Sequence, residues 1–466
     1  MKFYLTALMV LLLTACDKSD HGEPSPKTTI THKKNIFSKA EIDEVLNQYK
    51  NKEKFMGSVA IFKDSKIIYT YATGYSDYAN KKPSTPDTKF RIASITKSFT
   101  AILALMAAEE GKIKLSDTLD NYFPAIPNAN IITIEQMLKH RSGLRSYTSH
   151  PDFITFIYEG KTVDEMLDII SSYESDFEPG TKESYSNSNA YLLTLILEKI
   201  YADSYANLIS SKITQPLQLK NTYYAEGLSS TRNEAYSYHN QSNTERSKDA
   251  HHSVMLGAGG LVSKPTDLVK LYYSLFNGKV LSQQSLNRMM STDDTFGLGI
   301  QKITYSGKNS FGHRGRVDDF NSIVIHNLDE NFTLAVTDNS SFTEIPAMVK
   351  DIYYAYFKDA SVLISAEELE KFVGTYKPYN PENHDAVFER EGDKLIHVIA
   401  GEYRSELLYE GSNTFLLDQS YAPAITITFS EDGSKLKLEF SKDNDKQKQD
   451  EEIKFDYEKK IELTTD

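Results

Sequence analysis

The chain has 466 residues, of which 40% are hydrophobic and 25% charged, a composition that excludes a collagenous, disordered or multi-span membrane protein and leaves room for two or three domains. Its 52 Lys and Arg against 65 Asp and Glu give a net charge of −13, so we expect no nucleic-acid partner. The single cysteine, Cys16, excludes an intrachain disulfide, a Cys-based zinc site and a dithiol redox motif.

Residues 1–15 have the pattern of a secretory signal. Lys2 precedes the apolar run Phe3–Leu13, which is too short to span a membrane because a helix needs about 20 residues for that. Cys16 directly follows Leu-Thr-Ala, and this sequence resembles the lipobox of bacterial lipoproteins. The resemblance implies a bacterial lipoprotein, periplasmic or at the cell surface, held to the membrane by lipid on Cys16. The alternative is an ordinary signal peptide with a chance cysteine, and residues 16–37 predict a flexible tether.

Residues 38–360 predict one domain of helices and antiparallel strands. Ser38 and Glu41 form a capping box ahead of a first helix. Expected helices follow at Ser94–Glu110, Ile134–Lys139, Val163–Tyr173, Ala190–Tyr201 and Thr266–Phe276. Expected strands are the hairpin Gly57–Phe62 and Ile67–Ala72, then Gly297–Ile303, Ser310–His313, Asn321–His326 and Thr333–Thr337. A hairpin, then helices, then strands predicts one antiparallel sheet that the N- and C-terminal strands share.

Residues 365–466 predict a separate β domain. Short alternating runs lie at Leu395–Ala400, Ile425–Phe429, Leu436–Phe440 and Ile453–Tyr457. Gly392-Asp393 and Asp432-Gly433 supply turns. We therefore expect antiparallel strands in this part of the chain.

Three short motifs carry candidate chemistry. The first is Ser94-Ile95-Thr96-Lys97, at the start of a predicted helix, where residues three apart share a face and the Lys97 amine can reach the Ser94 hydroxyl. A lysine whose pKa is lowered by burial can take the serine proton. The others are Tyr185-Ser186-Asn187 and Gly312-His313-Arg314-Gly315. The first motif is weak alone, since Ser434–Lys437 matches it within a predicted strand.

In this order the motifs resemble those of the penicillin-recognising serine hydrolases, nearest the class C β-lactamase-like branch with its D-alanyl-D-alanine carboxypeptidases, D-aminopeptidases and esterases. The segments that flank them are similar as well: Ile132–Leu144, Gln215–Leu217, Gly259–Ser263 and Phe296–Gly299. The resemblance implies an α+β fold, a β-lactamase/transpeptidase-like antiparallel sheet flanked by helices with a helical subdomain. Leu369–Tyr376 resembles the start of lipocalin-like domains appended to this family, which implies an antiparallel β-barrel for residues 365–466.

The resemblance implies a catalytic role for three residues. Ser94 would attack a carbonyl and carry the acyl group. Lys97 would be the base or the electrostatic partner in that attack. Tyr185, as a phenolate, would pass the proton to the leaving group and later activate water.

Further residues would bind the substrate. Asn187 would hydrogen-bond the substrate amide. His313 stands where β-lactamases carry lysine, and it would steady Tyr185 and the substrate carboxylate. Histidine at this position favours a peptidase over a dedicated β-lactamase.

An oxyanion hole is also implied. The backbone N–H groups of Ser94 and Arg316 would form it, and Gly315 would let the substrate backbone approach closely. Relatives often place Thr or Ser at the position of Arg314 and a small residue at that of Arg316. Either arginine would clamp an anionic substrate terminus, or both would point to solvent.

We therefore expect a lipid-anchored serine hydrolase that acts through an acyl-enzyme on Ser94, as a D-Ala-D-Ala carboxypeptidase or D-amino-acid peptidase. A β-lactamase or a small-ester esterase on the same machinery is the alternative, and a non-catalytic lipoprotein is the third hypothesis. The expected partners are a small-molecule or peptide substrate and the membrane. The implied mechanism requires no metal and no cofactor, and we interpret the adjacent His251-His252 as part of a loop.

Overall fold

The structure is a computed structural model that describes residues 38–51, 55–239, 245–292, 295–305, 308–340, 343–357, 365–379, 384–392, 394–399, 403–411, 413–417, 425–440 and 454–459. Among these residues, no helix has the length and apolar character that crossing a membrane requires. The predicted signal sequence, Cys16 and the predicted tether lie outside the described residues.

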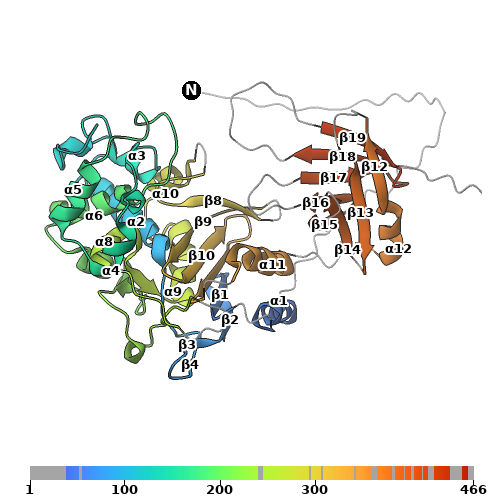
Figure 1. Ribbon diagram of the computed structural model, residues 1–466, viewed down its shortest axis with the longest axis horizontal. Coiled ribbons are helices and arrows are strands. Elements are labelled where there is room, and N and C mark those ends of the chain that lie inside the picture. The colour runs from blue at the N-terminus through green and yellow to red at the C-terminus, as the bar shows by residue number, and fades with distance from the viewer. Residues whose placement is uncertain are drawn as a thin grey trace, which may run out of the picture. The chain divides into compact units, whose positions relative to one another are not determined.

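A six-stranded antiparallel sheet lies at the centre of the first part of the chain (Figure 1), with the strand order β2-β1-β11-β10-β9-β8. Its strands are β1 (Gly57–Lys63), β2 (Lys66–Thr73), β8 (Gln301–Tyr305), β9 (Lys308–Val317), β10 (Phe320–Asn327) and β11 (Phe332–Asp338). The predicted hairpin is β1 with β2, and β1 also pairs with β11. The N- and C-terminal strands therefore share one sheet, as the element order predicted.

Both faces of this sheet are covered, so β11 is buried throughout and β1 and β10 are buried at all but one residue each. Along β1, Val59 and Ile61 join a cluster with helices α1 (Lys39–Asn51) and α11 (Ile345–Phe357). Ala60 and Phe62 point to the opposite face and join the larger helical core. The sequence pattern did not predict α11.

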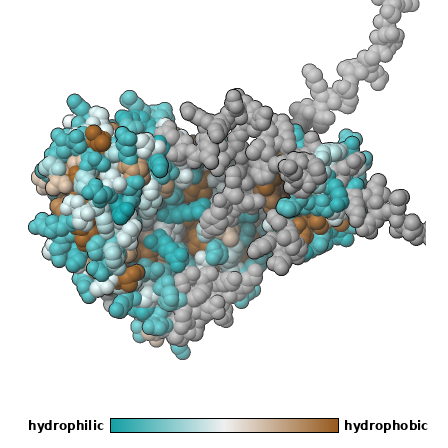
Figure 2. Space-filling view, turned by 45° about the horizontal axis from the view of Figure 1, so that its top comes forward, coloured by the Kyte–Doolittle hydropathy of each residue, from teal (hydrophilic) through white to brown (hydrophobic). Residues whose placement is uncertain are grey.

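The helical part surrounds α2, whose residues from Thr96 to Leu105 are all buried. A helix that is apolar on every side belongs inside a core. The helices of this part are α2 (Thr96–Glu109), α3 (Ile134–Leu138), α4 (Phe153–Glu159), α5 (Val163–Ser171), α6 (Asn187–Tyr201), α7 (Tyr205–Leu208), α8 (His252–Gly259), α9 (Pro265–Phe276) and α10 (Gln283–Met290). His252 opens α8 and His251 caps it, so the loop interpretation of this pair was wrong for His252. On the face drawn in Figure 2, hydrophilic residues predominate over this part and apolar ones are scattered.

The described residues beyond 365 form a β domain around an aromatic cluster that includes Phe372, Tyr376, Phe388, Phe415 and Phe429. Each strand pairs with the next, and β19 pairs with β12, so that the ladder closes on itself. The strands are β12 (Gly374–Pro378), β13 (Ala386–Glu391), β14 (Lys394–Ile399), β15 (Tyr403–Gly411), β16 (Thr414–Leu417), β17 (Ile425–Phe429), β18 (Lys435–Phe440) and β19 (Lys454–Lys459). The lipocalin likeness stays a prediction.

His326 on β10 is a buried titratable group of the core, 1% exposed. Its Nδ1 lies 2.7 Å from Thr333 Oγ1, and its ring stacks on Phe276 with centroids 4.7 Å apart. Burial lowers the pKa of His326 from 6.5 to about 3. The folded protein therefore holds this imidazole neutral.

We expect His326 to make the protein less stable in acid. Below about pH 6.5 the unfolded chain binds a proton at this residue and the folded chain does not, so stability falls as pH falls. Between about pH 6.5 and 5, protonation of His326 in the unfolded chain should lower the free energy of unfolding by about 2 kcal/mol. In His326→Gln, the free energy of urea unfolding should not fall by this amount over the same pH range. His384→Gln is the control, because that residue is exposed. An unchanged pH dependence in His326→Gln would contradict the expectation.

Candidate active site

Ser94 lies in a short 3₁₀ turn, η1 (Ala93–Ile95), directly ahead of α2. Ala93 has a φ of +44°, which is rare for a residue with a Cβ and marks a strained backbone. The prediction placed Ser94 on the helix itself. The tighter turn instead directs its side chain between two cavities that open on either side.

Two side chains reach Ser94 Oγ. Lys97 Nζ lies 3.1 Å away, one turn along the chain. The Tyr185 hydroxyl donates to Ser94 Oγ over 2.7 Å from the loop that precedes α6. Residues from two separate motifs therefore meet at one oxygen atom, as the resemblance implied.

The Lys97 amine is buried, with the residue 3% exposed. Nζ donates to Asn187 Oδ1 and to the Ala258 carbonyl, both at 2.8 Å. Burial lowers the pKa of Lys97 well below 10.5, because a desolvated ammonium is unfavourable. A neutral amine has two N–H bonds and one lone pair. The two carbonyl oxygens take both N–H bonds, and the lone pair is left to accept the Ser94 proton.

Tyr185 is packed between rings. His140 and Phe296 lie against it with centroids 4.5 and 5.7 Å away, and Lys97 Nζ is 4.9 Å from the ring centre. Part of the ring is exposed, but desolvation raises the pKa of the hydroxyl above 10.0. Tyr185 is therefore a protonated donor in the resting site, where we had expected a phenolate.

Asn187 holds Lys97 in place. It is the first residue of α6, and its Oδ1 accepts from Lys97 Nζ. Its Nδ2 makes longer contacts with Ser146 Oγ at 3.3 Å and Thr148 Oγ1 at 3.4 Å. The implied bond to a substrate amide stays a prediction.

His313 is 1% exposed and lies in the middle of β9, not at its end. Its Nδ1 is 2.6 Å from the Arg314 carbonyl, which makes Nδ1 the protonated nitrogen. Nε2 has no partner among the described residues. Burial lowers the pKa of His313 to about 3. At neutral pH it is an uncharged acceptor, so it cannot attract a substrate carboxylate as the lysine of β-lactamases does.

The two cavities beside Ser94 differ in the side chains that line them. One, of about 400 Å³, is lined mainly by polar and basic residues, including His313, Arg314, Arg316, Gln301 and Asn321. The other, of about 310 Å³, has Tyr147, Phe153, Ile157, Met255 and Val317 in its wall beside Thr148, Asn187 and Arg316. Arg316 borders both cavities and is exposed.

Gly315 brings β9 against the turn that carries Ser94. A Cβ added at Gly315 would lie 2.3 Å from the Ile92 carbonyl oxygen and 3.0 Å from Ser94 N. The strand backbone therefore runs directly beside the Ser94 N–H group, as the proposed oxyanion hole requires. Only glycine fits at this distance.

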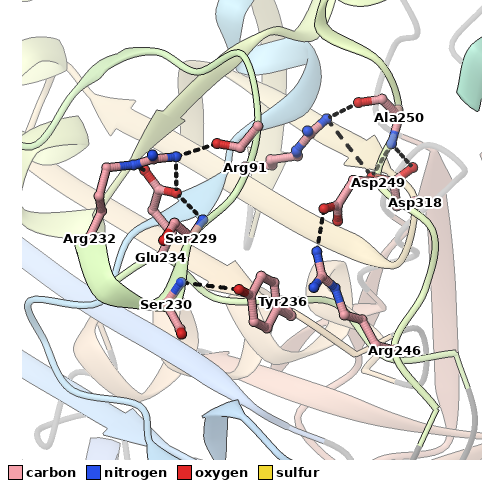
Figure 3. A network of polar contacts seen from close by, with 11 residues as sticks. Arg91, Ser229, Ser230, Arg232, Glu234, Tyr236, Arg246, Asp249, Ala250 and Asp318 are labelled. Atoms are coloured by element: carbon pink, nitrogen blue, oxygen red, sulfur yellow. Dashed lines mark hydrogen bonds and ion pairs between the residues drawn. The ribbon is translucent and has the colours of Figure 1, made fainter. Parts of the chain in front are cut away.

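A buried polar network, which no sequence motif indicated, fixes the turn after β9 (Figure 3). Arg91, 2% exposed, donates to the Ala250 carbonyl over 2.8 Å and lies 4.0 Å from the Asp318 carboxylate. Both Asp318 oxygens accept from Ala250 N at 3.1 Å. Desolvation raises the pKa of Asp318 to about 6. The network anchors the chain two residues beyond Arg316.

Comparisons with known proteins agree on one family. The beta-lactamase family model matches residues 43–356. Protein flp of Staphylococcus aureus (strain MW2) is 28% identical over 331 residues, 68% of this chain and 66% of its own length. The teichoic acid D-alanine hydrolase of Staphylococcus aureus (strain MRSA252) is 27% identical over 58% of this chain and 65% of its own. The chain thus spans slightly under two thirds of these curated relatives.

A solved structure is also similar. The D-amino acid amidase from Ochrobactrum anthropi SV3, complexed with L-phenylalanine amide, matches with a TM-score of 0.61 and 26% identity. The match covers 68% of this chain and 97% of the amidase. Nearly the whole amidase therefore corresponds to about two thirds of this chain.

We expect Gly315→Ala to lower the reactivity of Ser94. The new Cβ, 2.3 Å from a carbonyl oxygen, must push β9 away from the Ser94 turn, and small misplacements of catalytic groups cost about tenfold or more in rate. The rate of labelling by a fluorophosphonate, followed by intact mass, measures this. Gly227→Ala is the matched control, since nothing lies within 4 Å of its added Cβ. Labelling of Gly315→Ala at the wild-type rate would contradict the close approach.

Proposed function

The chain belongs to the beta-lactamase family of serine hydrolases, and on that premise we propose that it is a lipid-anchored hydrolase that forms an acyl-enzyme on Ser94. The observation that carries the proposal is the meeting of Lys97 and Tyr185 at Ser94 Oγ, at 3.1 and 2.7 Å. Burying a lysine beside a serine costs free energy, and a non-catalytic lipoprotein has no function that requires this arrangement.

In the proposed acylation, neutral Lys97 takes the Ser94 proton as Oγ attacks the substrate carbonyl. The N–H groups of Ser94 and Arg316 hold the oxyanion, an interaction that is often worth about 3 kcal/mol. Tyr185 then gives its phenol proton to the departing group, and the Lys97 ammonium restores it. Release of the leaving group completes the acyl-enzyme.

In the proposed deacylation, water replaces the leaving group. Lys97 is the base: as the water attacks the acyl carbonyl, Tyr185 takes a proton from the water and gives its own proton to Lys97. The bond to Ser94 Oγ breaks, and Oγ recovers its proton. No metal and no cofactor enters either half of the reaction.

The substrate we propose is a peptide that contains D-amino acids, of the cell-wall type. Two relatives act on D-amino-acid derivatives by name, a teichoic acid D-alanine hydrolase and a D-amino acid amidase. Arg314 and Arg316 in the polar cavity suit an anionic peptide terminus. Because His313 is neutral, we assign that role to the arginines rather than to His313.

A β-lactamase or a small-ester esterase is the second candidate function. Phe153, Ile157 and Met255 in the cavity of about 310 Å³ beside Ser94 favour it, because their side chains offer an apolar surface to an uncharged acyl group.

We further propose that acyl chains on Cys16 attach the protein to a bacterial membrane, periplasmic or at the cell surface, through the tether 16–37. Residues 365–466 would be a lipocalin-like β-barrel appended to the hydrolase domain. The antiparallel ladder that returns from β19 to β12 supports the second assignment.

A reporter β-lactam should acylate Ser94, and Ser94→Ala should abolish the adduct while leaving the circular dichroism spectrum unchanged. Intact mass against time distinguishes the candidates. A lasting adduct indicates a peptidase with slow deacylation, and a transient adduct with ring-opened product indicates a β-lactamase. Ser434→Ala is the matched control, because Ser434–Lys437 repeats the Ser-x-x-Lys spacing. An acyl-enzyme on Ser94 is ruled out if neither the β-lactam nor activated esters label this serine.

Lys97→Arg should slow fluorophosphonate labelling by about a hundredfold, because a guanidinium stays protonated at working pH and has no lone pair to accept the Ser94 proton. In the wild type, the low pKa of Lys97 should keep labelling fast at neutral pH and reduce it in acid. Labelling rates from about pH 5 to 9 measure both effects. Lys199→Arg on the exposed side of α6 is the control. A Lys97→Arg variant as fast as the wild type would exclude Lys97 as the base.

A further inference from the structure

His140 occupies a backbone position that favours glycine or asparagine. It follows α3 and its C-cap Lys139, and its φ is +55°. Helices commonly end at a residue in this left-handed conformation, which a side chain with a Cβ disfavours. A histidine kept at such a position, beside a reactive serine and tyrosine, suggests that its side chain has a function.

His140 holds the chain on both sides of Tyr185. Its carbonyl oxygen accepts from Ser184 N over 2.8 Å. Its ring Nδ1 accepts from Ser186 N over 3.1 Å. One residue therefore binds the two N–H groups that flank Tyr185 in the sequence.

The His140 ring also lies against the Tyr185 ring. The residue is 3% exposed, and the ring centroids are 4.5 Å apart with an interplanar angle of 36°. Phe296 contacts both rings, with its centroid 4.8 Å from that of His140 and 5.7 Å from that of Tyr185. Two hydrogen bonds to His140 thus fix the loop that carries Tyr185, and the His140 imidazole packs against the Tyr185 ring.

A second layer of hydrogen bonds orients the imidazole itself. Asn189 Nδ2 lies 3.3 Å from His140 Nδ1, and Asn189 Oδ1 accepts from Ser142 Oγ over 2.6 Å. Because Nδ1 accepts a backbone N–H, it carries no proton. Burial lowers the pKa of His140 well below 6.5, so this acceptor persists at working pH.

We propose that His140 is a positioning residue that sets the place of the Tyr185 hydroxyl relative to Ser94 Oγ by bracketing the 184–186 loop and stacking on the Tyr185 ring. This inference rests on the proposed function, in which Tyr185 acts on Ser94. His140 touches neither substrate nor Ser94 in this scheme. Its effect on the reaction passes through Tyr185 alone.

The test is a double-mutant cycle on the maximal rate of Ser94 labelling by a reporter β-lactam, whose ring nitrogen needs the Tyr185 proton as the ring opens, with intact mass as the readout. His140→Gly suits the backbone but removes the ring and its acceptor. It should lower the maximal labelling rate at least tenfold in the wild-type background, with the half-saturating probe concentration unchanged. In the Tyr185→Phe background, His140→Gly should change the rate less than twofold, since the hydroxyl it positions is already gone.

His140→Asn provides the rescue. Asparagine tolerates the left-handed backbone and offers an oxygen acceptor to Ser186 N, so it should label within about threefold of the wild type. Ala202→Gly is the matched control, because Ala202 ends α6 with a φ of +52° away from the site. It should leave labelling unchanged.

Each other outcome overturns the proposal. If His140→Gly lowers the labelling rate equally in the wild-type and Tyr185→Phe backgrounds, His140 has only a general structural role. If it does not lower the rate in the wild-type background, His140 has no role in the reaction. If His140→Asn does not recover the labelling rate, the hydrogen bond from Ser186 N to the side chain at position 140 is not what sets that rate. If Tyr185→Phe labels as fast as the wild type, the role of Tyr185 in the proposed function fails, and the positioning role fails with it. If Ser94→Ala still labels, the proposed function fails on its own ground.

Discussion

The desolvation of one amine is the constraint on which the site depends. The proposed role of Lys97 as a base requires that the amine is buried and that its N–H groups meet neutral carbonyl oxygens. A carboxylate partner would have the opposite effect and keep the ammonium charged. Three helices must therefore come together: α2 carries Lys97, α6 begins with Asn187, and α8 contributes the Ala258 carbonyl. The packing of the helical core is in this sense a condition for the proposed mechanism.

Much of this could be predicted from the sequence, because the motifs combine local geometry with chain order. The spacing of Ser94 and Lys97 correctly placed an amine beside a hydroxyl, and the family model confirms the resemblance on which Tyr185 was chosen. The sharing of one sheet by β1 and β11 also followed from the order of the elements. The hydrophobic patterns and the three motifs together were thus sufficient to predict the β-lactamase-like fold of helices and antiparallel strands.

The rest depends on tertiary burial, which a sequence pattern does not show. The resting phenol at Tyr185 and the neutral His313 follow from desolvation by residues distant in the chain. The strand expected at Gly297–Ile303 begins only at Gln301. Gly299, with a φ of +71°, lies so close to α2 that its Cβ would meet Ala101 at 2.3 Å. The predicted strand is there replaced by a loop packed on the catalytic helix.

The pairing of β1 with β11 has a consequence for how the active site forms. Met56 N donates to Asp338 Oδ1 across 282 residues of sequence, and the helices that hold Lys97 lie between these two points. Contacts of such long range raise the contact order of a domain and slow its folding. During synthesis, Ser94 leaves the ribosome long before the strands that lie beside it. Ser94 therefore gains the neighbours that complete the proposed site only once nearly the whole domain is available.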